Sequence, residues 1–519
     1  MASTFFGLTI AYTGLQAAQT SINVTSHNLA NINNQSYTKE TASIKAGEAL
    51  RSYAKYGTLG AGVIVDAINQ TRDSYYDEKY RNNYTNYGQY NVKDTYMSQI
   101  QNYLNEFTLK GYSTEYENFF AALNQLDLTP ADTSAKNQLI NNAKSLADYF
   151  NTLTTNLRNV QADANNEIKD AVQQINSYAK NIAALNRQIN QIEANYGNAN
   201  DLRDKRNAMI DELSEIVNLE TSEEDMGNNV SNFSVRINGQ TLVSSYSYNT
   251  LETVARTDKK NYSDAEGLYD VQWNSGQKFD MYSTSLSGHL KGLIDIRDGN
   301  NGEHENIETD DNGNNVTDSD GNLVLTTAPA ADKTVSYKGV PYYQAQLNEF
   351  AKIFSDAVNK IMKSGYTSDG SSKGISLFVT QPNTTVMSAG NITVNPELLK
   401  NADLLAIKKE QNDGESDAKI MEELNKLQSE KIFAGGTGSY FLESIVSDMS
   451  IDSQKAVNLY KNYTDLKTSI HNQRLSIMGV DTDEEAMDMI KYQQAYNLNS
   501  KMMSVMNQIY DKLINQTGI

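Results

Sequence analysis

The sequence of 519 residues contains no cysteine, which excludes disulfide bonds, thiolate metal sites and cysteine nucleophiles. It contains no apolar run that approaches the ~18 residues of a membrane-spanning helix. Its 44 lysines and arginines are outnumbered by 64 aspartates and glutamates, which gives a formal net charge of -20. Nucleic acid and anionic membranes repel such an acidic chain, so we expect neither of them as a partner.

Basic residues are also missing from the N-terminus, where the first lysine is Lys39. A secretory signal carries positive charge before its apolar segment. If this chain leaves the cell, we therefore expect it to use another export route.

Proline is scarce, with only five copies at Pro130, Pro329, Pro341, Pro382 and Pro396. Because proline breaks the interior of a helix, the first 129 and the last 123 residues are free to be helical. The mean hydropathy of -0.58 is typical of long, half-exposed helices rather than of a compact enzyme.

Charge is nearly absent from both ends of the chain. No aspartate, glutamate, lysine or arginine occurs in the first 38 residues, and the last 28 contain only Lys501, Asp511 and Lys512. Uncharged side chains can pack against other copies without burying unpaired charge. A lone helix of this kind is marginally stable in water, so we expect both ends to be loose in the monomer and to order on assembly.

Both ends also show helical periodicity. Near the start, apolar residues recur every seven positions at Leu8, Leu15, Ile22 and Leu29, and Ile32 extends the second row of the repeat. Near the end, Leu498, Met502, Val505, Ile509 and Leu513 follow helical spacing. We predict that the two helices pair as a terminal coiled coil and that these ten residues form its assembly seam.

Two further helices are indicated in the first half of the chain. A helix is predicted from about Asp66 to Phe107, and its stripe of tyrosines (Tyr76, Tyr80, Tyr84 and Tyr87) is more typical of core than of a ligand site. Another carries isoleucine at every seventh position (Ile168, Ile175, Ile182 and Ile189), which favours an intramolecular helical bundle.

After about Glu224, the apolar residues recur at every second position instead of at helical spacing. Alternating apolar residues lead into Asn238-Gly239, a pair that fits a type I′ hairpin turn, and we place Trp273 in the core of the same β-rich insert. Helical spacing returns near Leu347 and dominates from about Ser416.

The predicted fold is therefore mainly α with a β-rich insert, in an elongated multi-domain chain. We expect a terminal coiled-coil domain at 1–65 with 465–519, a long helical domain at 66–225 with 345–464, and an outer β-rich domain at 226–344. An acidic loop is expected at 299–321.

Motifs for catalysis and metal binding are incomplete. The segment from His304 to Glu308 lacks the second histidine of a HExxH zinc site. The segment from Asp310 to Gly321 lacks the glycine and the final glutamate of a calcium loop. We predict no enzymatic activity, no catalytic residues, no cofactor and no metal.

Several segments resemble the flagellar hook-associated protein 1 family, which forms hook–filament junctions. SHNLANINNQSYTK (26–39) is similar to the SxNxANxxTxGYxR signature of axial proteins, and SIMGVDTDEEAMDMIKYQQAYNLNSKMM (476–503) is similar to their C-terminal motif. Between them, FFAALNQLDLTP (119–130), IAALNRQI (182–189), DLRDKRNAMIDELSEIV (201–217) and GHLKGLIDIRD (288–298) resemble the same family in order. The motif residues carried by this resemblance are Asn28, Ala30, Asn31, Tyr37, Tyr492, Gln493, Ala495 and Tyr496.

The resemblance implies a structural subunit of the extracellular bacterial flagellum, exported through the flagellar type III channel. It also implies a ring-like layer of copies between the hook protein and the third hook-associated protein, and a cytoplasmic export chaperone that binds the C-terminal helix. The alternatives are another axial subunit, such as the third hook-associated protein or a flagellin-like protein, and a surface adhesin that uses the β insert.

Overall fold

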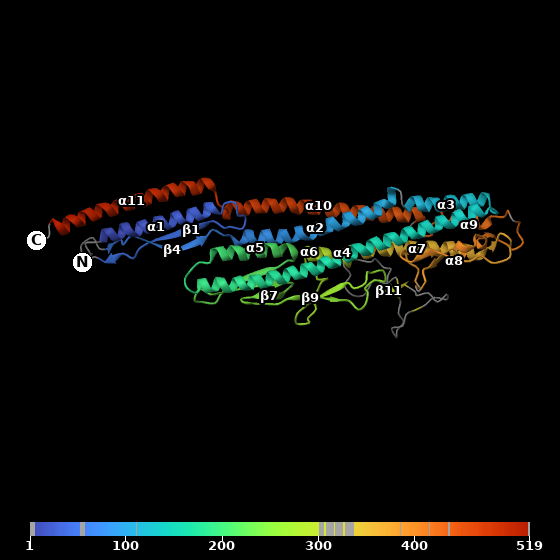
Figure 1. Ribbon diagram of the computed structural model, residues 1–519, viewed down its shortest axis with the longest axis horizontal. Helices are drawn as coiled ribbons and strands as arrows, with labels where there is room; N and C mark the ends of the chain where they lie inside the picture. Colours follow the sequence, from blue (N-terminus) through green and yellow to red (C-terminus); the bar gives the residue numbers. More distant parts are fainter. Residues whose placement is uncertain are drawn as a thin grey trace. The chain divides into compact units, whose positions relative to one another are not determined.

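The computed structural model describes residues 6–51, 58–109, 112–299, 306–307, 316, 325–326, 337–382, 384, 386–414, 416–433 and 436–516. The fold is mainly α-helical with small antiparallel sheets, as predicted (Figure 1). Among the described residues, no helix combines the length and the apolar character that crossing a membrane requires.

The helices are α1 (Phe6–Ala30), α2 (Ser74–Leu109), α3 (Tyr112–Leu128), α4 (Thr133–Glu193), α5 (Asn200–Ile216), α6 (His289–Arg297), α7 (Val340–Ser364), α8 (Pro396–Lys400), the 3-10 turn η1 (Ala402–Leu404), α9 (Lys419–Lys426), α10 (Gly438–Met478) and α11 (Thr482–Asn515). The strands are β1 (Glu40–Ala46), β2 (Leu50–Arg51), β3 (Thr58–Leu59), β4 (Val63–Gln70), β5 (Glu220–Asp225), β6 (Ser231–Ile237), β7 (Gln240–Ser244), β8 (Ser247–Tyr248), β9 (Leu251–Ala255), β10 (Tyr269–Trp273), β11 (Asn306–Ile307), β12 (Leu325–Thr326), β13 (Tyr366–Thr367), β14 (Phe378–Thr380), β15 (Ile392–Val394) and β16 (Ala406–Lys408).

The chain forms two compact units. The first contains the described residues of Met1–Thr85, Ile175–Thr250 and Thr464–Ile519, and the second those of Asn86–Gln174 and Leu251–Tyr463. The first unit therefore holds both ends of the chain. The three-domain division expected from the sequence stays a prediction.

In the first unit, α1 lies alongside α11 and also contacts the β1–β4 hairpin (Figure 1). The predicted helical start near Asp66 is wrong, because Asp66 lies in β4 and α2 begins only at Ser74. In β4 the apolar residues Ile64, Val65 and Ile68 fit helical spacing as well as a short strand, and pairing with β1 decides between the two.

The first unit also contains a four-stranded sheet, ordered β5-β6-β7-β8, that lies against α4. The predicted hairpin turn is confirmed, since Asn238 and Gly239 have φ values of 50° and 76°. Amide side chains of α4 attach the sheet: Asn186 donates to the Ser245 carbonyl at 2.9 Å and Asn190 to the Ser231 carbonyl at 2.8 Å.

The isoleucines at every seventh position of α4 are fully buried, as the intramolecular-bundle prediction requires. The tyrosine stripe of α2 is half-buried, and two of its residues contact α10. Within the first unit, Arg474 lies over the Tyr80 ring at 5.1 Å and Lys467 over the Tyr84 ring at 4.3 Å.

The second unit has a phenylalanine-rich core. Phe350 of α7 stacks on Phe433 with ring centroids 4.9 Å apart, and Phe354 lies 5.7 Å from Phe119 of α3. Trp273 in β10 is buried, which confirms its predicted core position. The predictions that the zinc and calcium motifs are incomplete concern His304, Asp310 and Gly321. All three lie outside the described residues.

Candidate assembly interface

Small residues form the contact between α1 and α11. A Cβ added at Gly14 would lie 2.7 Å from Oδ1 of Asn499, and one at Gly7 would lie 2.9 Å from Cε of Met506. Position 7 thus faces position 506, and position 14 faces position 499, so the two helices run antiparallel. The absence of side chains at these glycines lets α11 approach the α1 backbone closely.

The large apolar residues predicted as the N-terminal seam lie beside this contact. Leu8, Leu15, Ile22, Leu29 and Ile32 are half-buried. The residues of α1 that are fully buried are smaller: Ala11, Ala17, Ala18, Ser21, Val24, Thr25 and Asn28. Small or polar residues also repeat every seven positions on this helix, at Gly7, Gly14, Ser21 and Asn28. A search for large apolar residues does not detect this repeat.

The C-terminal residues of the predicted seam are exposed in the single chain. Their exposed fractions are 69% for Leu498, 53% for Met502, 47% for Val505, 44% for Ile509 and 50% for Leu513. These five residues, called the α11 stripe below, are exposed although α11 packs against α1. A continuous apolar stripe on an exposed helix marks an interaction surface, although its role in assembly stays a prediction.

The C-terminal motif residues divide between two sides of α11. Tyr492, Ala495 and Tyr496 are half-buried, and Tyr492 lies one heptad before Asn499 on the side that faces α1. Gln493 is exposed. Three of these four residues therefore lie on the side of α11 that packs against α1.

The N-terminal motif ties the end of α1 to β1. The buried Asn28 side chain donates to the Glu40 carbonyl and accepts from the Glu40 amide, both at 3.0 Å. The buried Tyr37 hydroxyl donates to Oδ1 of Asn28 at 2.8 Å. Asn31 donates to the His27 carbonyl at 3.0 Å, and Ala30 is exposed. Burial raises the pKa of Tyr37, with a further contribution from the Glu40 carboxylate, so its hydroxyl keeps its proton.

A buried carboxylate attaches this motif to α5. Both oxygens of Asp204 accept from Thr38, from its amide and its hydroxyl, at 2.8 Å. Arg72 reaches the same carboxylate at 3.2 Å and also pairs with Asp77 at 2.7 Å. Burial raises the pKa of Asp204, while the bonds from Thr38 and the charge of Arg72 oppose that rise. Sequence reasoning missed this network, although Asp204 and Thr38 both lie in segments that resemble the family.

The turn between α10 and α11 is held to the start of β1. The Lys39 amide donates to the Met478 carbonyl at 2.8 Å, and its ammonium lies 2.7 Å from Glu484 and 3.3 Å from Glu485. Burial lowers the pKa of Lys39, but the bonds to the two glutamates outweigh burial and raise it overall. Asp481 caps α11 by accepting from the amides at 483 and 484.

His27, Glu40 and Asp201 bring possible metal-ligand atoms within 4.8 Å of one another. Nδ1 of His27 already lies 3.4 Å from Glu40 and 3.2 Å from the Tyr37 hydroxyl. These contacts account for the cluster as part of the motif, and the absence of a metal stays a prediction.

A chain whose charge-poor terminal helices pair and leave an apolar stripe exposed is suited to self-assembly as a structural subunit. A solved structure of similar fold is the flagellar hook junction protein FlgK from Burkholderia pseudomallei, with a TM-score of 0.60 and 15% identity over 77% of this chain and 100% of that one. The family model of the flagellar hook-associated protein FlgK helical domain matches residues 97–378. The model of the flagellar basal body rod FlgEFG protein C-terminal region matches residues 471–516.

The chain belongs to the FlgK family of flagellar hook-associated proteins. Flagellar hook-associated protein 1 of Bacillus subtilis (strain 168) is 26% identical over 543 aligned residues, which cover 100% of this chain and 99% of that protein. The protein of the same name from Escherichia coli (strain K12) is 26% identical, covering 97% of this chain and 98% of its own length. The chain is accordingly a structural component of the bacterial flagellum.

Proposed function

We propose that this protein builds the junction between hook and filament by packing the α11 stripe against neighbouring subunits. The observation that supports this proposal is the exposure of five apolar side chains on a helix whose other side is already paired with α1. Water-exposed apolar area of this kind gains roughly 25 cal/mol per Å² when a partner covers it. From Tyr492 on, the same helix carries only three charged residues (Lys501, Asp511 and Lys512), so a partner can cover this part at a small desolvation cost.

The proposed neighbours are copies of this chain in a ring-like layer, with the hook protein on one side and the third hook-associated protein on the other. Export through the flagellar channel would deliver the subunits. Lack of disulfides suits that route, because a chain without cross-links can be threaded unfolded.

The stripe can be tested because the neighbouring positions of α11 provide a matched control. In a strain that lacks the gene, we compare Val505→Asp with Ile509→Asp as one double variant and Ser504→Asp with Gln508→Asp as the other. All four positions are exposed, so neither double variant should disturb the fold of the monomer. Circular dichroism of the purified monomers checks this point.

We expect the control to restore filaments and the stripe variant to leave bare hooks, with filament monomer lost to the medium. Electron microscopy of the cells and immunoblots of the medium measure both results. The blot also shows whether the variant itself was exported. Normal filaments from the stripe variant would contradict the proposal, and intact filaments from the deletion strain would favour the adhesin alternative.

We also propose that the stripe receives the export chaperone before assembly, because it offers an exposed apolar surface on the C-terminal helix. Calorimetry with the purified chaperone should show binding at least tenfold weaker for the stripe variant than for the control. Equal affinities would place the chaperone on another surface.

A further inference from the structure

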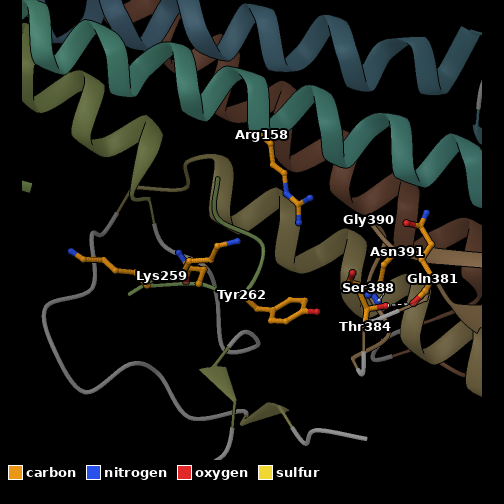
Figure 2. Close-up of a pocket in the computed structure, with 10 residues that line it drawn as sticks. Arg158, Lys259, Tyr262, Gln381, Thr384, Ser388, Gly390 and Asn391 are labelled. Carbon is orange, nitrogen blue, oxygen red and sulfur yellow. Dashed lines mark hydrogen bonds between the residues drawn. The ribbon is translucent and has the colours of Figure 1, made fainter. Parts of the chain in front are cut away.

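A pocket of about 630 Å³ opens in the second unit (Figure 2). Residues from three parts of the chain line it. They are Arg158 on α4, residues 259–262 between β9 and β10, and Gln381, Thr384, Ser388, Gly390 and Asn391 between β14 and β15. Figure 2 shows Arg158 reaching from its helix into the space that the other two segments border.

Arg158 brings an available positive charge to this pocket. Its Nε donates to the Ser263 carbonyl at 3.0 Å, and no other partner of its guanidinium lies among the described residues. No acidic side chain is among the described residues that line the pocket. Lys259 at the rim pairs with Glu266, and Lys260 is hydrogen-bonded to Tyr282. A cation without a carboxylate partner is notable in a chain with a net charge of -20.

The opposite wall is preformed and polar. The Asn391 side chain accepts from the Ser388 amide at 2.8 Å and donates to the Val386 carbonyl at 2.7 Å, which holds this wall in place. Ser388 is a buried residue that lines the pocket, and its hydroxyl makes no hydrogen bond to the described residues. A Cβ at Gly390 would lie 2.8 Å from the Thr154 side chain, so glycine is what allows the wall to approach α4 closely.

Aromatic and amide groups complete the lining. Figure 2 shows the Tyr262 ring directed toward Thr384 and Ser388. The Gln381 side-chain amide donates to the Asn151 side chain at 3.3 Å. This bond leaves the side-chain carbonyl oxygen of Gln381 available as an acceptor. The pocket thus combines the Arg158 guanidinium and two lysines with hydroxyl groups, amide groups and an aromatic ring.

We propose that this pocket binds a small acidic sugar, with Arg158 holding its carboxylate or phosphate. A guanidinium matches either group through two parallel hydrogen bonds. Serine and amide side chains pair with sugar hydroxyls, and a tyrosine ring packs on the apolar face of a sugar. The volume lies within the range of roughly 300–1,000 Å³ that is usual for small-molecule sites. This site is independent of the α11 stripe.

Titration calorimetry on the full chain tests the ligand class. The probes are glucuronate and glucose 6-phosphate, with glucose and inorganic phosphate as controls. We expect at least one acidic sugar to bind tenfold more tightly than either control, and the tighter of the two identifies the anionic group. No binding at about 10 mM, or phosphate alone binding as tightly as the acidic sugars, would overturn the proposal.

Two variants test the residues. Arg158→Gln should weaken binding of the acidic sugar at least tenfold, while Arg187→Gln, an exposed arginine on the same helix, should leave it unchanged. Ser388→Ala should weaken binding by about two- to tenfold. Thermal melts confirm folding, and if Arg158→Gln does not fold, Ser388→Ala decides. Unchanged affinity in the folded variants would show that the pocket is not the binding site.

Discussion

Asn28 joins α1 to β1 through one buried amide. In Asn28→Ala, the Tyr37 hydroxyl and both main-chain groups of Glu40 lose this partner. An unsatisfied buried polar group costs roughly 1–3 kcal/mol, so we expect the free energy of unfolding of the first unit to fall by about 2–4 kcal/mol. Urea unfolding followed by circular dichroism measures the change. The control is Asn23→Ala on the exposed face of the same helix, with an expected change of about 0.5 kcal/mol or less. Equal effects would mean that the amide network does not stabilise the motif.

Asp298 is the centre of a buried ionic cluster in the second unit. Arg256 pairs with it at 2.7 Å, Arg297 at 2.6 Å, and the Tyr282 hydroxyl donates to it at 2.9 Å. Asp298→Asn leaves the buried Arg297 guanidinium without this carboxylate and leaves Arg256 with only the exposed Asp270, so we expect a loss of about 3–5 kcal/mol in the free energy of unfolding. Asp270→Asn is the matched control, because Asp270 also pairs with Arg256 but its side chain is 54% exposed. Its loss should stay below about 1 kcal/mol. An equal loss in both variants would argue against the buried cluster.

The same cluster predicts how stability depends on pH. Burial alone would raise the pKa of Asp298, but the charges of Arg297 and Arg256 outweigh burial and hold that pKa far below its ordinary range. A depressed folded-state pKa adds stability that is fully present above the unfolded value, near 3.9, and lost as the pH falls through the folded value. The difference in unfolding free energy between wild type and Asp298→Asn should therefore be constant from about pH 5 to 8 and shrink only in strong acid. Denaturant titrations at several pH values measure it, and a decline already near pH 6 would point to another group.

The pairing of α1 with α11 depends on the space at Gly14. Leucine there would push into the Asn499 amide, and overpacking costs about 1–3 kcal/mol. Alanine adds a single atom against a flexible side chain and gains about 0.5–1 kcal/mol of helix propensity, so Gly14→Ala should be nearly neutral. Hydrogen exchange of α11 amides should rise in Gly14→Leu. Gln16→Leu on the exposed face of α1 is the control, and equal exchange in both leucine variants would show that the glycine is not needed for pairing.

At the scale of the whole molecule, the ends should be the least protected parts of the monomer. Lys491, Lys501 and Lys512 are exposed on α11, while Ile182 and Ile189 of α4 are fully buried. We expect trypsin to trim α11 and chymotrypsin to cut at the exposed Tyr12, both well before α4 is cleaved. Mass spectrometry of timed digests identifies the cuts.

The same digestion, carried out on assembled junctions, provides a comparison with the monomer. If the α11 stripe is covered by neighbouring subunits, cleavage at Lys501 should slow severalfold in assembled junctions relative to the monomer. If the terminal helices of the monomer resist protease to the same degree as α4, this result would contradict the expectation that the ends order only on assembly.

Much of the fold could be predicted where a periodic pattern is long. Four isoleucines at intervals of seven identify α4 and its buried face, because one side of a helix is sampled at that spacing. Asn238 and Gly239 identify a hairpin turn, because few residues accept two consecutive positive φ values. The β1–β4 hairpin was missed because short apolar runs fit a strand and a helix equally well.

The candidate site was predictable as a pair of helices, but not in its details. In the part of α11 from Tyr492 on, where charges are few, uncharged polar and apolar residues occur on several faces, so spacing alone does not show which face meets α1. Leu498 and Val505 looked suitable for the seam, yet the α1 contact uses Asn499 and Met506.

The sequence by itself determined that the ends are helical and nearly free of charge, that α4 has one buried face, and that the chain resembles flagellar axial proteins. These properties depend on residues close together along the chain. Only the tertiary structure decided which stripe of α11 stays exposed, how Asp204 attaches the motif, and that Arg158 and Ser388 line one pocket. Such contacts join residues more than a hundred positions apart, and packing rather than local preference selects them.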